Sequence, residues 1–191
     1  MNWNDFLSRF DDVLEGRTTS APYDNPAYIE YVKLNASRQK RWTKTLSLSD
    51  ETNDVLRSID GVQQWILITE DWCGDSAHNT PFIVAMAAEN PLIHFDIVLR
   101  DTPPLLIDQY LTNGGRSIPK LIVRDANGKD LFTWGPRPAG CQQLMMDMKV
   151  QEIAPADAKI ELQKWYNDDK GASIQQELTL LLKSVQKESV V

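Results

Sequence analysis

The spacing of apolar and polar residues predicts a chain that begins with helices. Four apolar residues near the N-terminus recur at spacings of one, three and four, which marks one buried helix face: Phe6, Leu7, Phe10 and Leu14. Pro22 and Pro26 separate this helix from a second one over about residues 27–40. Ser49-Asp50-Glu51-Thr52 is suited to cap a third, short helix that ends at Asp60-Gly61.

The pattern then changes to short runs of branched and apolar residues, which are typical of strands. Residues 62–69 and 93–99 are expected to be buried strands, and residues 74–89 between them a helix that contains Pro81. Residues 105–111 are expected to form a short helix, closed by Asn113-Gly114-Gly115.

A hairpin and further helices follow. Residues 120–123 and 131–134 are apolar runs joined by a turn at Asn127-Gly128. Helices are expected over 142–150 and over 157–185, the latter broken at Lys170-Gly171. The order β-α-β-α-β-β-α predicts an α/β fold with a central mixed sheet flanked by helices.

Composition limits the classes of partner. The chain has 20 Lys and Arg against 27 Asp and Glu, a net charge of −7, and no basic run, which argues against nucleic acid or an anionic membrane as a partner. No segment has the roughly 20 apolar residues of a membrane span. The start, Met1-Asn2-Trp3-Asn4-Asp5-Phe6, lacks the basic and apolar parts of a secretory signal, so a cytoplasmic location is expected. Both cysteines should then be thiols, and nothing indicates an oligomer.

The candidate chemistry lies in Trp72-Cys73-Gly74-Asp75-Ser76, between a strand and a helix. A thiol at a helix N-terminus faces free backbone N–H groups and the positive end of the helix dipole, which favour the thiolate. Because position 76 is serine, Cys73 cannot close a local Cys-x-x-Cys disulfide.

Four features in this order resemble the thioredoxin family. They are Trp72-Cys73-Gly74, Pro81 eight residues after the cysteine, Arg116-Ser117-Ile118-Pro119, and Asn127-Gly128 with Gly135. The resemblance implies a thioredoxin-like core over 61–150, with a helical N-terminal extension (1–60) and C-terminal helices (151–191) packed on it as one domain. Such extensions are similar to those of larger bacterial thioredoxin-like proteins.

The resemblance also implies a site. Pro119 is expected to be cis and to face Cys73, which would expose the backbone of Ile118 to an extended substrate. Ile118, Pro119 and Gly135 would line the substrate groove, together with Gly74 and Asp75 and with Trp72 as its apolar wall. Arg116 could offset the negative charges of Asp75 and Asp71, so the pKa of Cys73 is expected to be modestly lower than the usual 8.5 or so.

Three departures from the family bear on function. Ser76 replaces the resolving cysteine, Asp75 replaces the usual proline, and Leu67 occupies the position of the family's buried acid. Cys73 could then form mixed disulfides with protein or low-molecular-weight thiol and disulfide substrates, but release would require an outside thiol or Cys141. No cofactor is expected.

Other interpretations remain open from the sequence. The chain could be a redox-inactive thioredoxin-like peptide- or protein-binding module, with Cys73 inert in the core. Cys-Gly-Asp-Ser is also similar to the motif of monothiol glutaredoxins, which share an iron–sulfur cluster with glutathione. Cys141 is expected to be a packed residue rather than a resolving thiol, and Glu70-Asp71 a solvated strand end. His78 and His94 show no spacing typical of a metal site.

Overall fold

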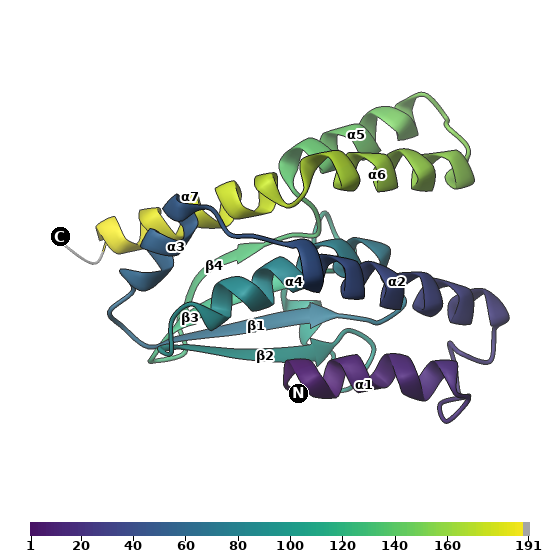
Figure 1. Ribbon diagram of the computed structural model, residues 1–191, viewed down its shortest axis with the longest axis horizontal. Helices are drawn as coiled ribbons and strands as arrows, with labels where there is room; N and C mark the ends of the chain where they lie inside the picture. The colour runs from purple at the N-terminus through teal and green to yellow at the C-terminus, as the bar shows by residue number, and fades with distance from the viewer. Residues whose placement is uncertain (189–191) are drawn as a thin grey trace.

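A four-stranded mixed sheet lies at the centre of the computed structural model, which describes residues 1–188 (Figure 1). The strands are β1 (Gln63–Thr69), β2 (Ile93–Leu99), β3 (Lys120–Asp125) and β4 (Asp130–Trp134), in the order β2-β1-β3-β4. β1 and β2 are parallel, and β3 is antiparallel to both β1 and β4. The predicted thioredoxin-like α/β fold, with its mixed sheet and hairpin, is confirmed.

Seven helices surround the sheet in the described residues: α1 (Trp3–Leu14), α2 (Pro26–Thr45), α3 (Asp50–Arg57), α4 (Gly74–Ala88), α5 (Ala139–Val150), α6 (Pro155–Asp169) and α7 (Ala172–Glu188). Ser49 caps α3 as predicted, but the helix ends three residues early. α2 is longer than predicted, because its last turns bury Trp42 against the core. The predicted helix at 105–111 is a single 3-10 turn, Leu106–Gln109.

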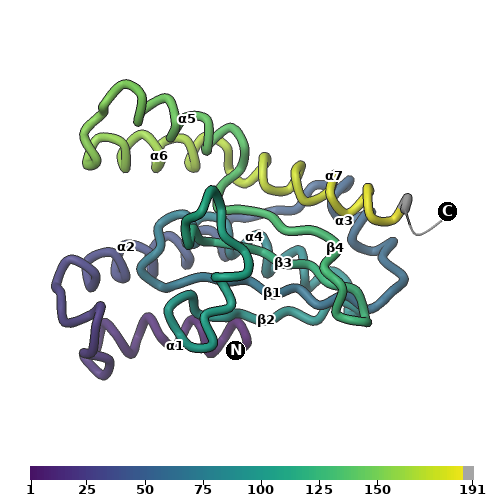
Figure 2. Tube along the Cα trace, turned by 180° about the vertical axis from the view of Figure 1, so that it is seen from behind, coloured from purple at the N-terminus to yellow at the C-terminus, as the bar shows by residue number. Residues whose placement is uncertain are grey.

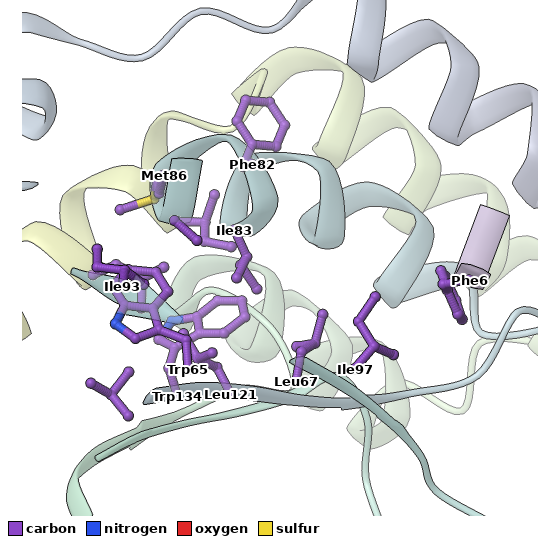
Figure 3. Packing of buried hydrophobic residues seen from close by; sticks show 14 of the residues in the cluster. Phe6, Trp65, Leu67, Phe82, Ile83, Met86, Ile93, Ile97, Leu121 and Trp134 are labelled. Atoms are coloured by element: carbon purple, nitrogen blue, oxygen red, sulfur yellow. The ribbon is translucent and has the colours of Figure 1, made fainter. Parts of the chain in front are cut away.

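The alternation of side chains along β1 builds two apolar layers. Trp65 and Leu67 point to one face, where they meet Ile83 and Met86 of α4 (Figure 3). Ile66 and Ile68 belong to a smaller cluster that also contains Cys73. Cys73 therefore sits over the second layer, at the edge of the core.

The terminal helices share the main core. Phe6 of α1 and Leu178 of α7 are fully buried in the same cluster as the sheet. α5 and α6 lie side by side as a pair that extends beyond the sheet, near α2 (Figures 1 and 2). The division into an extension, a core and C-terminal helices stays a prediction. None of the helices within residues 1–188 has the length and apolar character that a bilayer span requires.

Candidate functional site

Cys73 lies where β1 leads into α4. It is the N-cap residue of α4, and its side chain makes no capping hydrogen bond. Its Sγ is 3.4 Å from the carbonyl oxygen of Ile118, and the Ile118–Pro119 peptide bond is cis. The structure therefore places Cys73 beside the loop of Pro119, where the resemblance put it.

Gly135 supports this loop from the end of β4. Its φ is +113°, and a Cβ at this position would lie 2.2 Å from the Pro119 carbonyl oxygen. Only glycine allows so close an approach. Pro119 and Gly135 thus pack against each other, whereas Ile118 and Pro136 contribute to the wall of the pocket beside Cys73.

The protonation state of Cys73 differs from the expectation. Its side chain is only 8% exposed, and this burial, with a smaller contribution from the Asp75 carboxylate, raises its pKa to about 11. The Ser76 hydroxyl and backbone N–H and the Arg137 guanidinium act in the opposite direction, but less strongly. The predictions of a lowered pKa and of an exposed turn were wrong, because apolar side chains from both β1 and the Pro119 loop enclose the sulfur.

Ser76 has a polar role in place of the missing thiol. It is 1% exposed, its hydroxyl has no hydrogen-bond partner of ordinary geometry within residues 1–188, and Ser76 acts to lower the pKa of Cys73. A hydroxyl so placed can stabilise a thiolate but cannot displace a disulfide.

The positive charges around Cys73 come from residues that the sequence did not single out. Arg116, the predicted charge partner, is exposed and forms a two-bond ion pair with Asp108, at 2.6 and 2.8 Å. Arg137 acts to lower the pKa of Cys73, and its Nη2 is 2.6 Å from Asp75 Oδ2. Asp75 also accepts a hydrogen bond from the Tyr166 hydroxyl, 2.9 Å long.

Glu70 and Asp71 form a buried acidic pair rather than a solvated strand end. Their side chains are buried, so the prediction was wrong. Glu70 Oε1 accepts the Asp101 backbone N–H at 3.0 Å, and burial raises the pKa of Glu70 to about 7. Asp71 accepts a short hydrogen bond from Tyr23 and pairs with Arg9 at 3.2 Å. Tyr23 and Arg9 come from the N-terminal part of the chain, and no local sequence pattern predicts their contact with Asp71.

A pocket of about 870 Å³ opens beside Cys73. One wall carries Trp72, which packs edge-on against Tyr28 of α2 and lies under the Arg100 guanidinium, 4.6 Å away. The opposite wall comes from α5 and α6, including Met145 and Leu162. Gly74 and Asp75 also line the pocket, and their role in binding substrate stays a prediction. The walls from α2, α5 and α6 lie outside the minimal family motif and were not foreseen.

His78 lines the same pocket as a neutral side chain. Its Nδ1 accepts the Trp42 indole N–H at 3.0 Å, so its proton lies on Nε2, 3.3 Å from Gln163 Oε1. The ring stacks on Tyr166 at 4.3 Å, and burial lowers its pKa to about 3. In the described part of the chain, no group of three or more His, Cys, Asp or Glu side chains is arranged to hold a metal ion.

Cys141 lies in α5. It is fully buried, interacts with the Tyr166 hydroxyl, and burial raises its pKa to about 12. Both cysteines are free thiols.

Comparison with known proteins identifies the sequence family. The sequence model of the thioredoxin family matches residues 22–149, about two thirds of the chain. A crystal structure of a protein of unknown function from Pseudomonas aeruginosa is similar, with a TM-score of 0.60 and 17% identity over 81% of this chain and 90% of that chain. An HIV epitope-scaffold is also similar, with a TM-score of 0.55 and 16% identity over 96% of this chain and 99% of that chain. At these identities the likeness shows the fold alone. No curated protein matches the sequence.

Proposed function

Because the chain belongs to the thioredoxin family, we propose that it is a monothiol thiol–disulfide oxidoreductase with Cys73 as its nucleophile. The observation that carries this proposal is the position of the Cys73 sulfur, 3.4 Å from the Ile118 carbonyl oxygen and beside cis-Pro119 at the floor of a pocket. Trp72, Gly74, Asp75 and Ile118 line the pocket and frame the bound substrate, whereas Pro119 and Gly135, which do not line it, hold the Ile118 backbone in position.

The proposed cycle has two exchange steps. The Cys73 thiolate attacks one sulfur of a disulfide, a new sulfur–sulfur bond forms, and the other sulfur leaves as a thiolate that takes a proton from water. A second, external thiol, ionised to its thiolate, then attacks the substrate sulfur of the mixed disulfide. A new disulfide forms between these two sulfurs, the bond to Cys73 breaks, and Cys73 leaves as a thiolate. Ser76 stabilises that thiolate but cannot resolve the intermediate, and Cys141 is too buried to do so. A cycle that depends on a pool of small thiols suits the reducing cytoplasm.

The rival function is a redox-inactive binding module. A pKa of about 11 for Cys73 favours it, because only about one thiol in 10⁴ would be ionised at neutral pH. The oxidoreductase therefore needs bound substrate or a small opening of the pocket to ionise and expose the sulfur.

Adduct formation with a small neutral disulfide separates the two functions. Wild type, Cys73→Ala and Cys141→Ala are incubated with bis(2-hydroxyethyl) disulfide, and intact mass is recorded before and after addition of 2-mercaptoethanol. The proposal expects one reversible adduct on wild type and on Cys141→Ala, and none on Cys73→Ala. If wild type gains no more adduct than Cys73→Ala, the chain is a binding module.

A further inference from the structure

We infer that the pocket beside Cys73 binds a small thiol or disulfide that carries carboxylate groups, and that Arg38 of α2 receives one of these carboxylates. That the ligand contains a reactive sulfur rests on the proposed function. That the pocket binds an anion is argued independently, from the residues that line it.

The charge of the pocket is opposite to that of the chain. The chain has 20 Lys and Arg against 27 Asp and Glu. The pocket has one lining carboxylate, that of Asp75, and six lining cations: Arg38, Arg100, Arg116, Arg137, Lys149 and Lys159. A concave site with this excess of positive charge attracts anions.

Half of these cations are not neutralised by the protein. Each of three arginines pairs with a carboxylate, in the pairs Arg100–Asp101, Arg116–Asp108 and Arg137–Asp75. Within residues 1–188, Arg38, Lys149 and Lys159 have no carboxylate within ion-pair distance. The unneutralised charge lies on α2, α5 and α6, the elements that form the outer walls of the pocket.

Arg38 is held in place by neutral groups. Its Nε donates to Gln163 Oε1 at 2.7 Å, and its Nη1 donates to Asn35 Oδ1 at 2.8 Å. Removal from water lowers the pKa of its guanidinium. Three of its five N–H groups remain for other acceptors, and a planar fork of this kind fits a carboxylate with two hydrogen bonds. The guanidinium is therefore fixed in orientation. It forms no ion pair with a carboxylate within residues 1–188, and the Asp75 carboxylate acts on it only from a greater distance, where it acts to raise the pKa of Arg38.

The position of Arg38 places a bound carboxylate near the reactive sulfur. A Cβ on Gly74 would lie 3.3 Å from Arg38 Nη1, so the missing side chain lets the guanidinium approach the residue that follows Cys73. Arg38 and Cys73 line the same pocket. A ligand held by Arg38 would thus have its neighbouring atoms beside Cys73.

The dimensions of the site favour a small ligand over a protein. Its volume of about 870 Å³ lies within the range of small-molecule pockets. Cys73 is nearly buried, and residues of α2, α5 and α6 line the pocket beside it. A disulfide on the surface of a folded protein could not reach this floor, whereas a small disulfide with a flexible chain could.

Calorimetric titration with S-methylglutathione tests the anion site, because this peptide has two carboxylates and no reactive sulfur. We expect wild type and Cys73→Ala to bind equally, and Arg38→Gln to bind at least about tenfold more weakly, since a charge-assisted hydrogen bond is lost. Arg38→Lys, which keeps the charge but not the fork, should fall between them. The affinity of wild type should decrease with added salt, and the dimethyl ester of the probe should bind at least about tenfold more weakly.

Arg41→Gln is the matched control. Arg41 lies one turn further along α2 and also donates to an amide oxygen of α6, that of Asn167 at 2.7 Å, but it lies outside this pocket. The Arg41→Gln variant should bind the probe with the same affinity as wild type. The inference would be overturned if the probe did not bind wild type. It would also be overturned if wild type bound the probe and its ester equally well and Arg38→Gln bound the probe as tightly as wild type. Normal binding without any disulfide adduct on Cys73 would overturn the proposed function and support the anion site.

Discussion

The sulfur of Cys73 contacts the carbonyl oxygen of Ile118 at 3.4 Å, inside a layer of branched side chains. A protonated thiol can donate a hydrogen bond to that oxygen, whereas a thiolate would meet its negative end. The contact and the burial thus favour the same protonation state. The site therefore holds the Cys73 thiol in its protonated form, which has measurable consequences.

The pH dependence of alkylation should reveal this state directly. In a Cys141→Ala background, the rate of Cys73 modification by iodoacetamide should rise about tenfold per pH unit and level off only near pH 11, since only the thiolate reacts. Stopped or timed alkylation followed by mass spectrometry gives the profile. A plateau reached below about pH 9 would show that the buried position does not control the thiol.

Removal of the negative charge at Asp75 should make Cys73 more reactive. The Asp75 carboxylate contributes to the raised pKa of Cys73, and its loss would also free the charge of Arg137. We expect Asp75→Asn to be alkylated roughly three- to tenfold faster at about pH 8. Asp108→Asn, which removes an exposed carboxylate from Arg116, is the control and should react as wild type does. Unchanged or slower alkylation of Asp75→Asn would contradict the electrostatic contribution.

The buried carboxyl group of Glu70 should make stability depend on pH. Its pKa rises from 4.5 to about 7 on folding, so between these values the folded chain holds a proton that the unfolded chain has released. Its contribution to stability is therefore complete below about pH 4.5 and is lost as the pH rises through 7.

Glu70→Gln removes this titration and can keep the hydrogen bond from the Asp101 backbone N–H. Its free energy of unfolding should exceed that of wild type by about 1–3 kcal/mol at about pH 8, and match it at about pH 4. Urea unfolding at the two pH values measures the difference. A constant difference between the two proteins at both values would mean that Glu70 is not the titrating group.

Gly135 should be far less tolerant of a side chain than Gly128. Both have a positive φ, of 113° and 80°, but a Cβ on Gly135 meets the Pro119 carbonyl oxygen at 2.2 Å, whereas a Cβ on Gly128 meets nothing within 4 Å. Gly135→Ala should lower the free energy of unfolding by about 3 kcal/mol or more, and Gly128→Ala by only about 1 kcal/mol. Chemical denaturation of both variants tests the comparison. Equal losses would show that the close approach to Pro119 relaxes without cost.

Local patterns were sufficient to predict most of the fold. The apolar run of β1, the cap at Ser49 and the turn at Asn127-Gly128 are signals within a few residues of sequence, and the structure has each element where the signal lies. The motif residues also converge as the resemblance implied, with Cys73 beside Pro119.

The environment of the site could not be read in the same way, because it depends on contacts between distant segments. Tyr23 and Arg9 bury Asp71, and Gln163 of α6 orients Arg38 of α2. Neither contact could be predicted from the spacing of neighbouring residues in the sequence. The pKa of Cys73 was mispredicted for the same reason: the helix terminus is visible in the sequence, but the enclosure of the sulfur by Ile118 is not.

Ser76→Cys should convert the monothiol site into one that releases its own substrate. Position 76 lies in the first turn of α4, three residues after Cys73, and Ser76 acts on the pKa of Cys73. In a Cys141→Ala background, a thiol there should attack the mixed disulfide on Cys73 and expel the small thiol, leaving an internal disulfide. Intact mass after incubation with bis(2-hydroxyethyl) disulfide should then show loss of two hydrogens and no lasting adduct.

Ser76→Ala is the matched control for this substitution, because it also removes the hydroxyl but adds no nucleophile. Its adduct should form more slowly than that of wild type, since the thiolate loses a hydrogen bond, and should persist until an external thiol is added. Persistence of the adduct on Ser76→Cys would mean that position 76 cannot reach the sulfur–sulfur bond. The need for an outside thiol would then have a cause other than the serine at position 76.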